Sequence, residues 1–514
     1  MFNENTVEII EQYIRNNNKI NLDINENKNI DHKLRSSDDH DFSLISNDLD
    51  DIKVTADDDD LGFWNNIKKN FSDFKNKIKF NLIQIDNKFK LTEFRYAQIF
   101  DQTFDLKIKN DCEGINKFIF NEIIWMSYRN NFEPVIYDKC LYTSDAGWGC
   151  MIRAGQMMLA NALNMIYSQS DYKRQSKNDV LMLFLDDPIK YKCILDNSCF
   201  DYLKHSEENE IINKKESGIN IKNSFSHEEF EYVTKVSNFD KEKSLITPPF
   251  SIKNILSSSI MYNKGAGDWF SDNEIVKILK ELNEKYFPIE GPKILHFDEK
   301  IIFLDLIIKE CFEKKLCKCA NNNFNQDDYA VDEDEDSEFL VINQKYSSSE
   351  ICECFKDCFP FHNSYYEIKR PLIIFASMRL GLSKLEDVYY KAINDYFKIP
   401  NNLGIIGGKG SRALYFIGNC DSNLIFLDPH FVQESVKISD EFSDISASYR
   451  PLELFHVESE KMTPCITIGF CFNKSKNLIE TIEFIKEYQI NNSETIIEVR
   501  DFHIKNPIIS VYFK

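Results

Sequence analysis

The sequence predicts one α/β (α+β) domain, in which a helical layer packs against an antiparallel-rich sheet. Within residues 151–166, apolar side chains recur at the three- and four-residue spacing of a helix. Turn-forming residues at 419–423 separate two later apolar runs, which is the pattern of a β-hairpin. Four runs have the composition of strands: residues 371–377, 413–418, 424–428 and 465–472. The helical part therefore precedes the strand-rich part along the chain.

The helical segment begins at a cysteine that is a candidate nucleophile. Cys150 directly follows the turn-forming run Gly147-Trp148-Gly149. A thiol at a helix N-terminus faces unpaired N–H groups and the positive end of the helix dipole. Both favour the thiolate, which is the form that attacks carbonyl carbons. On this pattern alone, a buried structural cysteine is the alternative interpretation.

A nucleophilic cysteine needs a base, and two of the nine histidines accompany an aspartate at a strand-like run. Side chains two positions apart on an extended chain point to the same face, so Asp428 and His430 can stand side by side. The carboxylate would then fix the tautomer of the imidazole and stabilise its cation. Pro429 stiffens this pair. His296 and Asp298 share the spacing without the proline, so we favour His430 as the base and interpret His296 as a core histidine.

Several motifs follow one another in an order known from one protein family. The longest is Thr143-Ser144-Asp145-x-Gly147-Trp148-Gly149-Cys150-Met151-x-Arg153-x-x-Gln156. The others are Phe250-Ser251-Ile252, Asp268-Trp269-Phe270, Arg370-Pro371-Leu372, Arg379-Leu380-Gly381-Leu382, the glycine-rich stretch 403–409, the run 413–418, Asp428-Pro429-His430 and Ile466-x-Ile468-Gly469-Phe470. This series resembles the autophagins, papain-like cysteine proteases that process the autophagy ubiquitin-like modifier of the GABARAP type. The resemblance covers roughly residues 60–500 and is interrupted by two insertions.

The resemblance implies a papain-like fold, with the nucleophile on the helical layer and the base on the sheet. Cys150 would be the nucleophile, His430 its general base and Asp428 the group that orients the imidazole. Tyr128 would help to form the oxyanion hole together with the Cys150 amide.

The resemblance also implies two elements that control access to the site. Trp269 would cover the entrance, and Gly407, Gly408 and Lys409 would belong to a regulatory loop that closes from the other side. Many relatives have proline where this chain has Gly410, so we expect a more mobile loop here. Relatives also often have Gly-Pro after the tryptophan motif, where Ser271 and Asp272 stand in this chain.

The composition limits the possible binding partners of the protein and its cellular compartment. The 514-residue chain has a formal net charge of -21 at pH 7 and a pI of about 5.0, whereas nucleic-acid binding requires a basic surface. Its 14 cysteines lack the spacing of a disulfide framework. We recognise no secretory signal and no apolar stretch of membrane-spanning length. We therefore expect a cytoplasmic protein with reduced thiols.

We expect three regions along the chain. Residues 1–60 form a disordered acidic N-terminal region, residues 61–475 a papain-like peptidase domain, and residues 476–514 a C-terminal helix and tail. The peptidase domain contains two low-complexity insertions, at about 189–246 and 316–364.

Three further features have ordinary explanations beside functional ones. Phe339 and Ile342 follow an acidic run and resemble the short motifs that add a strand to the edge of the modifier, although such patterns often occur by chance. A basic amphipathic helix pattern from Trp64 suits transient membrane contact, but the resemblance favours a helix packed on the domain. Cysteines between Cys317 and Cys358 are spaced more tightly than most structural zinc ligands, so we favour unpaired thiols and predict no metal site.

The resemblance thus implies a cysteine endopeptidase that cleaves after the C-terminal glycine of the modifier. It would activate the precursor and also release the modifier from phosphatidylethanolamine, so its partners are the free and the lipid-conjugated modifier. The chemistry implies no metal and no organic cofactor. Two alternatives are a catalytically weak modifier-binding protein and a deconjugase of another ubiquitin-like protein.

Overall fold

The computed structural model describes residues 88–90, 93–138, 140–169, 176–190, 245–289, 291–316, 359–361, 364–438 and 445–500. Several predictions concern segments outside these residues. They are the region 1–60, the helix pattern at Trp64, the motif of Phe339 and Ile342, and the cysteines between Cys317 and Cys358. Most of the two insertions also lies outside the described residues.

The described part of the chain is built around a nine-stranded sheet, which is antiparallel except where β7 pairs with β12. The strand order is β17-β15-β14-β13-β18-β12-β7, and the hairpin of β1 and β2 joins through β14. The bounds are β1 Tyr96–Ile99, β2 Gln102–Asp105, β7 Lys293–Phe297, β12 Leu372–Arg379, β13 Asn402–Lys409, β14 Arg412–Cys420, β15 Asn423–Leu427, β17 Phe455–Glu458 and β18 Cys465–Phe472.

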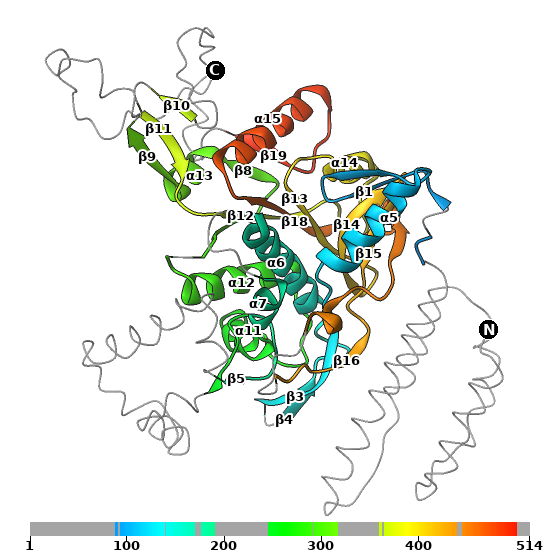
Figure 1. Ribbon diagram of the computed structural model, residues 1–514, viewed down its shortest axis with the longest axis vertical. Helices are drawn as coiled ribbons and strands as arrows, with labels where there is room; N and C mark the ends of the chain where they lie inside the picture. The colour runs from blue at the N-terminus through cyan, green and yellow to red at the C-terminus, as the bar shows by residue number, and fades with distance from the viewer. Residues whose placement is uncertain are drawn as a thin grey trace, which may run out of the picture. The chain divides into compact units, whose positions relative to one another are not determined.

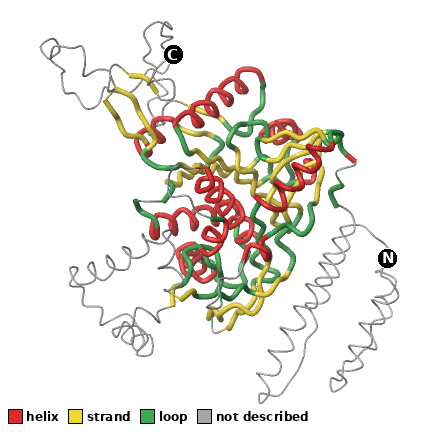
Figure 2. Tube along the Cα trace, in the orientation of Figure 1, coloured by secondary structure: helices red, strands yellow, loops and turns green. Residues whose placement is uncertain are grey.

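Helices cover both faces of this sheet (Figures 1 and 2). One face carries α6 Cys150–Gln169, α7 Lys177–Met182, α11 Ile252–Ser259 and α12 Asp272–Tyr286. The other carries α13 Leu304–Cys311, α14 Tyr390–Tyr396 and α15 Ser475–Asn491. This is the α+β arrangement that the sequence predicted.

The alternation of side chains along β12 explains why the central strands have continuous apolar sequences. Ile373 and Phe375 pack in the core shared with α6, whereas Leu372, Ile374 and Ala376 pack in the core shared with α14 and α15. Because helices cover both faces, neither set of side chains meets solvent.

The predicted helix and hairpin are confirmed. The segment 151–166 lies within α6, and β14 pairs antiparallel with β15 through a turn at Asp421 and Ser422. Asp421 adopts a φ of 51°, a left-handed conformation that aspartate tolerates in turns.

The glycine-rich stretch expected to form a loop is instead a strand. Gly407, Gly408 and Lys409 end β13 and pair with Leu414, Ala413 and Arg412 of β14. A Cβ at position 407 would lie 2.7 Å from Met462 Cε, and one at position 408 would lie 2.8 Å from the Arg412 carbonyl oxygen. Gly407 thus leaves room for the Met462 side chain, and Gly408 allows the backbone of β14 to come close. The connecting turn contains only Gly410 and Ser411.

The segment around Trp269 ends in a well-formed helix start. Ser271 accepts a hydrogen bond from the Glu274 N–H, and the Glu274 carboxylate accepts one from the Ser271 N–H, at 3.2 and 2.8 Å. This capping box satisfies two N–H groups of the first turn of α12. The Ser271-Asp272 departure from the Gly-Pro of relatives therefore serves to begin α12.

Smaller elements complete the described chain. They are α5 Lys109–Lys117, the π-helix Phe118–Glu122, β3 Tyr128–Tyr137, β4 Cys140–Ser144, β5 Ile189–Lys190, β6 Leu245–Ile246, β8 Ile301–Phe303, β9 Phe312–Leu316, β10 Phe359–Phe361, β11 Ser364–Ile368, β16 Val432–Glu434, β19 Glu498–Arg500, and 3₁₀ turns at Ile260–Tyr262, Asp387–Tyr389, Ile445–Tyr449 and Ser459–Lys461. The three-stranded sheet β16-β3-β4 positions the segments on either side of the candidate site.

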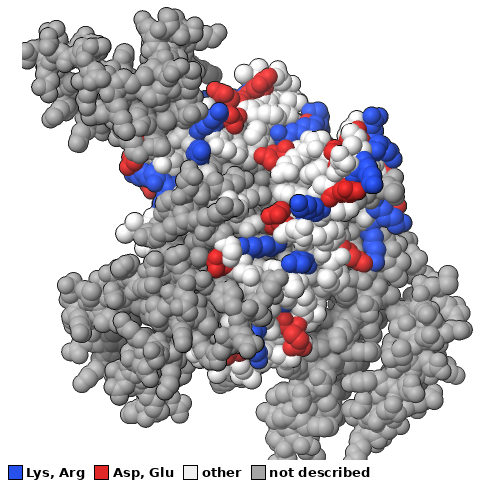
Figure 3. Space-filling view, in the orientation of Figure 1, with Lys and Arg blue, Asp and Glu red and all other residues white. Residues whose placement is uncertain are grey.

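Two surface properties bear on possible partners. Among the described residues, the helices are all too short or too polar to cross a membrane. On the face drawn in Figure 3, acidic and basic side chains of the described residues lie interspersed.

Candidate active site

The position of Cys150 is fixed by the turn that precedes it. The Asp145 carbonyl accepts hydrogen bonds from the N–H groups of Trp148 and Gly149, at 3.2 and 2.9 Å. The Gly149 carbonyl then accepts from the Arg153 N–H at 3.0 Å, which starts the hydrogen bonding of α6 at Cys150. The predicted place of this cysteine, at the first turn of a helix, is confirmed.

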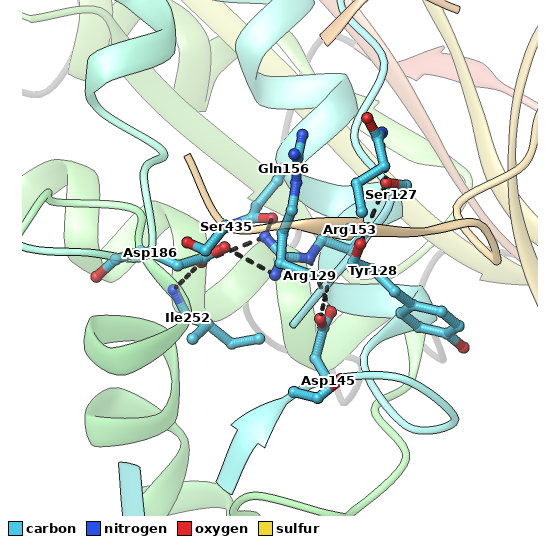
Figure 4. Close-up of polar contacts among 12 residues, drawn as sticks. Ser127, Tyr128, Arg129, Asp145, Arg153, Gln156, Asp186, Ile252 and Ser435 are labelled. Atoms are coloured by element: carbon cyan, nitrogen blue, oxygen red, sulfur yellow. Dashed lines mark hydrogen bonds and ion pairs between the residues drawn. The ribbon is translucent and has the colours of Figure 1, made fainter. Parts of the chain in front are cut away.

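A buried ionic network holds this turn against the rest of the domain (Figure 4). Arg153 Nε donates to the Asp145 carboxylate at 2.8 Å, and its Nη2 donates to Asp186 at 2.9 Å. Asp145 also accepts from the Arg129 N–H at 2.6 Å. All three ionic side chains are 2% exposed or less, so each charge depends on its partners.

Asp428 and His430 lie where β15 ends. The Nδ1 atom of His430 is 2.6 Å from Asp428 Oδ1, and because a carboxylate only accepts, Nδ1 is the donor. The pair is tied to β3 and to the segment before it by two hydrogen bonds to backbone carbonyls. The Trp125 side chain donates through Nε1 to the Asp428 carbonyl at 2.8 Å, and the Tyr128 N–H at the start of β3 donates to the Pro429 carbonyl at 2.9 Å. The predicted pairing of these two side chains is therefore present.

The imidazole of His430 meets the Cys150 thiol, so the helix and the sheet converge at one point. Burial alone would raise the pKa of Cys150, but the hydrogen bond and the charge of His430 outweigh it and lower that pKa below the ordinary value of 9.0. Burial likewise opposes the charge on His430, but Asp428 raises the pKa of the imidazole to about 9. The arrangement favours a thiolate–imidazolium pair.

Asp428 is anionic in this arrangement. Burial raises the pKa of its carboxyl, but His430 and Arg412 together lower it to about 2. The carboxylate can therefore hold the imidazolium through one oxygen while the other faces Arg412.

Tyr128 places a neutral hydroxyl beside the sulfur. Its ring is buried and packs edge-on against His430, with centroids 5.4 Å apart. Burial and the neighbouring Cys150 raise the pKa of Tyr128 well above its ordinary value, so the hydroxyl keeps its proton and can donate. Figure 4 shows the ring pointing away from the Arg153–Asp186 pair, so the ionic network does not occupy this hydroxyl.

Trp269 contacts the Gly147-Trp148-Gly149 turn through its indole. The indole Nε1 of Trp269 donates to the Gly147 carbonyl at 3.1 Å, and the Trp269 carbonyl accepts a hydrogen bond from Lys264 Nζ at 2.8 Å. The side chain is nonetheless 58% exposed, which is unusual for tryptophan and leaves an apolar surface beside the turn that precedes Cys150.

The competing histidine is engaged elsewhere. His296 Nε2 lies 2.8 Å from Ser377 Oγ, and burial lowers the pKa of the imidazole to about 4. Asp298 pairs instead with Lys277 at 2.6 Å. These contacts agree with the interpretation of His296 as a core histidine.

Four other described cysteines differ from Cys150 in the direction of their pKa shift. Burial raises the pKa of Cys311 and Cys471 to about 12, and it also raises the pKa of Cys420 and Cys465. Among the described cysteines whose pKa is shifted, Cys150 is the one whose pKa is lowered.

Sequence reasoning assigned no role to two groups that shape the site. Arg153 stands in an otherwise apolar stretch of helix, and a charge in such a place signals a buried ion pair, so this signal was available. Arg412 gave no such signal, because it follows a turn where an exposed arginine is ordinary.

Comparisons with known proteins agree with this geometry. Residues 116–484 match the family model of the Peptidase C54 catalytic domain, which is well over half of the chain. The chain is 24% identical over 386 residues to cysteine protease ATG4A of Homo sapiens, covering 74% of this chain and 76% of that protein. It is 23% identical over 396 residues to cysteine protease ATG4B of Xenopus laevis, covering 75% and 79%. With cysteine protease ATG4D of Xenopus laevis, the identity is 24% over 433 residues, covering 81% and 74%.

Proposed function

The chain belongs to the peptidase C54 family, the autophagins, and is a cysteine-type peptidase. On this premise we propose its substrate, the bond that it cleaves and its catalytic residues. The substrate is an autophagy ubiquitin-like modifier of the GABARAP type. The enzyme cleaves after the C-terminal glycine of the modifier, both in a precursor and in the conjugate with phosphatidylethanolamine.

The proposed chemistry begins with the thiolate of Cys150. Its sulfur attacks the carbonyl carbon of the terminal glycine and forms a tetrahedral intermediate. The imidazolium of His430 donates its proton to the leaving nitrogen as the C–N bond breaks. His430 then accepts a proton from water, whose oxygen attacks the acyl-enzyme and releases the modifier with a free carboxylate. Asp428 holds the imidazole through Nδ1, which leaves Nε2 for these transfers.

Two donors are available to the negative oxygen of the intermediate. The Tyr128 hydroxyl lies beside the sulfur. The Cys150 N–H belongs to the first turn of α6, where N–H groups have no intrahelical acceptor. Donors already aimed at the developing charge stabilise it without reorganisation.

The selectivity for glycine follows from the surroundings of the cysteine. The indole of Trp269 contacts the turn that precedes Cys150, and the β13–β14 hairpin brings the backbone at Ala413 to its sulfur. A residue without a side chain suits an approach bounded by an indole and by a strand rich in glycine. A peptide extension and phosphatidylethanolamine both join the glycine carbonyl through an amide nitrogen, so one mechanism serves both substrates.

The observation that carries the proposal is the contact of Cys150 with His430, accompanied by the lowered pKa of this thiol. The test incubates the protein with a GABARAP-type modifier bearing a C-terminal extension, and separately with the same modifier conjugated to phosphatidylethanolamine in vesicles. Products are identified by mass spectrometry. Cys150→Ser is the inactive variant, and Cys140→Ser, which alters an exposed cysteine in β4, is the matched control.

We expect the wild type and Cys140→Ser to release both products with a free terminal glycine, and Cys150→Ser to release neither. Tight binding of the modifier without cleavage would identify a modifier-binding protein instead. Cleavage of another ubiquitin-like protein but not of this one would reassign the substrate while retaining the chemistry.

A further inference from the structure

Arg412 and Ala413, at the start of β14, contact opposite ends of the candidate catalytic group. The Arg412 guanidinium Nη2 pairs with Asp428 Oδ2. The next residue, Ala413, directs its N–H to the Cys150 sulfur. One dipeptide, placed directly after the Gly410-Ser411 turn, therefore touches both the orienting carboxylate and the nucleophile.

The two oxygens of Asp428 are divided between two cations. Oδ1 accepts from His430 Nδ1 at 2.6 Å and from the His430 N–H at 3.0 Å. Oδ2 faces Arg412. The side chains of Asp428 and Arg412 are only 5% and 16% exposed, so solvent screens this pair weakly.

The guanidinium also balances the charge of the buried group. Thiolate, imidazolium and carboxylate together carry one negative charge, and Arg412 brings the sum to zero. Burying charges is costly unless partners compensate for it. The buried Arg412 Nε has no hydrogen-bond partner among the described residues. Within this part of the chain, the guanidinium is therefore held by its contact with Asp428.

We propose that Arg412 is a positioning residue that fixes Asp428, and through it His430, and so couples the β13–β14 hairpin to catalysis. The inference rests on the roles proposed above for Asp428 and His430. The orientation of the imidazole then depends on the hairpin, because displacing the turn moves the guanidinium away from the carboxylate.

The first test compares Arg412→Gln and Arg412→Lys with Arg95→Gln. The last variant is the control, because Arg95 is an exposed arginine distant from Arg412 in the sequence. Iodoacetamide alkylation of Cys150 is followed against pH by peptide mass spectrometry, without any modifier present. Loss of the guanidinium removes a positive charge near the thiolate and loosens His430, so the acid limb of the profile for Arg412→Gln should move to higher pH. Arg412→Lys should recover most of that shift, because it restores the charge, and Arg95→Gln should match the wild type.

The second test measures cleavage of the extended modifier. Misplaced catalytic groups lower turnover, so Arg412→Gln should lower kcat by about 10-fold to 100-fold with KM changed by less than about threefold. Arg412→Lys should lose less, since it lacks only the planar fork. In an Asp428→Asn background, the further change Arg412→Gln should cost about twofold or less, because both changes disable the same contact.

The proposal is overturned if Arg412→Gln keeps the wild-type alkylation profile while folded by circular dichroism, or if its effect on kcat is fully additive with that of Asp428→Asn. If Arg412→Gln does not fold, Arg412→Lys decides through its turnover: a kcat equal to that of the wild type would contradict a positioning role for the planar guanidinium. If the proposed substrate is wrong, the wild type will not cleave it. The alkylation test uses no modifier, so it would still test the role of Arg412.

Discussion

Gly149 lies directly against the side chain of Asp145. A Cβ at position 149 would stand 2.7 Å from Asp145 Cβ, and closer still to the carboxylate oxygen that binds Arg153. The Gly149 N–H donates to the Asp145 carbonyl at 2.9 Å, so neither residue can move away without opening the turn. The residue before the proposed nucleophile is therefore glycine because a buried carboxylate occupies the space of its side chain.

We predict that Gly149→Ala lowers the free energy of unfolding by about 1–3 kcal/mol, because overpacking forces side chains or backbone to shift. The same change should slow cleavage strongly, since the displaced turn carries Cys150. Gly114→Ala is the matched control: it lies in α5, and its nearest neighbour would be Phe104 Cε1 at 3.9 Å. Denaturant unfolding and cleavage rates check both variants. Equal effects of the two substitutions would refute the packing argument.

The pH dependence follows from the directions of the pKa shifts. The lowered pKa of Cys150 means that the thiolate persists below pH 9.0, and the pKa of His430 means that the imidazolium persists up to about 9. Turnover needs that proton for the leaving nitrogen, so kcat should fall as the pH rises through about 9. Asp428, with a pKa of about 2, stays anionic throughout the range of such an experiment.

The same shifts predict stability. The raised pKa of His430 stabilises the fold fully below its ordinary value of 6.5, and this contribution is lost as the pH rises through about 9. The lowered pKa of Cys150 acts in the opposite direction, so the comparison is made without the thiol. The free energy of unfolding should decrease over that interval in Cys150→Ser and decrease less in Cys150→Ser combined with His430→Gln. Parallel pH profiles of the two proteins would argue against a charged imidazole.

Much of this arrangement was predictable from local patterns. The start of α6 at Cys150, the β14–β15 hairpin and the pairing of Asp428 with His430 follow from helical spacing, a turn sequence and the two-residue period of an extended chain. Each of these depends on residues close together in the sequence.

Features set by distant packing were not predictable. The stretch around Gly407 was expected to be a loop from the family resemblance, yet pairing with β14 and β18 makes it a strand. Arg412 meets Asp428 only because β14 and β15 align, and no spacing rule reports such a contact. The role of Tyr128 came from the family resemblance and not from the residues alone.

Tyr128 offers a test of the oxyanion hole. Tyr128→Phe removes the hydroxyl while keeping the ring that packs against His430. We expect kcat to fall by about 10²-fold to 10³-fold, the usual effect of losing one oxyanion donor, with little change in KM. Steady-state cleavage of the extended modifier measures this. A variant with unchanged kcat would show that the hydroxyl does not meet the developing charge.

The turn of the β13–β14 hairpin offers another test. Gly410 has a φ of 60°, and no other atom lies within 4 Å of where its Cβ would stand. Proline is locked near -65° and cannot adopt this conformation, so Gly410→Pro should lower the free energy of unfolding by more than about 1 kcal/mol. It should also slow cleavage, because the turn precedes Arg412. Gly410→Asn is the control, since asparagine tolerates positive φ and space is available. Equal unfolding midpoints for Gly410→Pro and the wild type would contradict the assigned conformation.

The most direct measurement of the central claim uses a GABARAP-type modifier whose terminal glycine carries an electrophilic vinyl ester. The labelled protein is digested and its 14 cysteines are mapped by mass spectrometry. We predict one covalent adduct, on Cys150, formed within minutes at neutral pH and greatly slowed in His430→Gln. An adduct on a different cysteine, or equal labelling of several, would contradict the account of how this enzyme attacks its substrate.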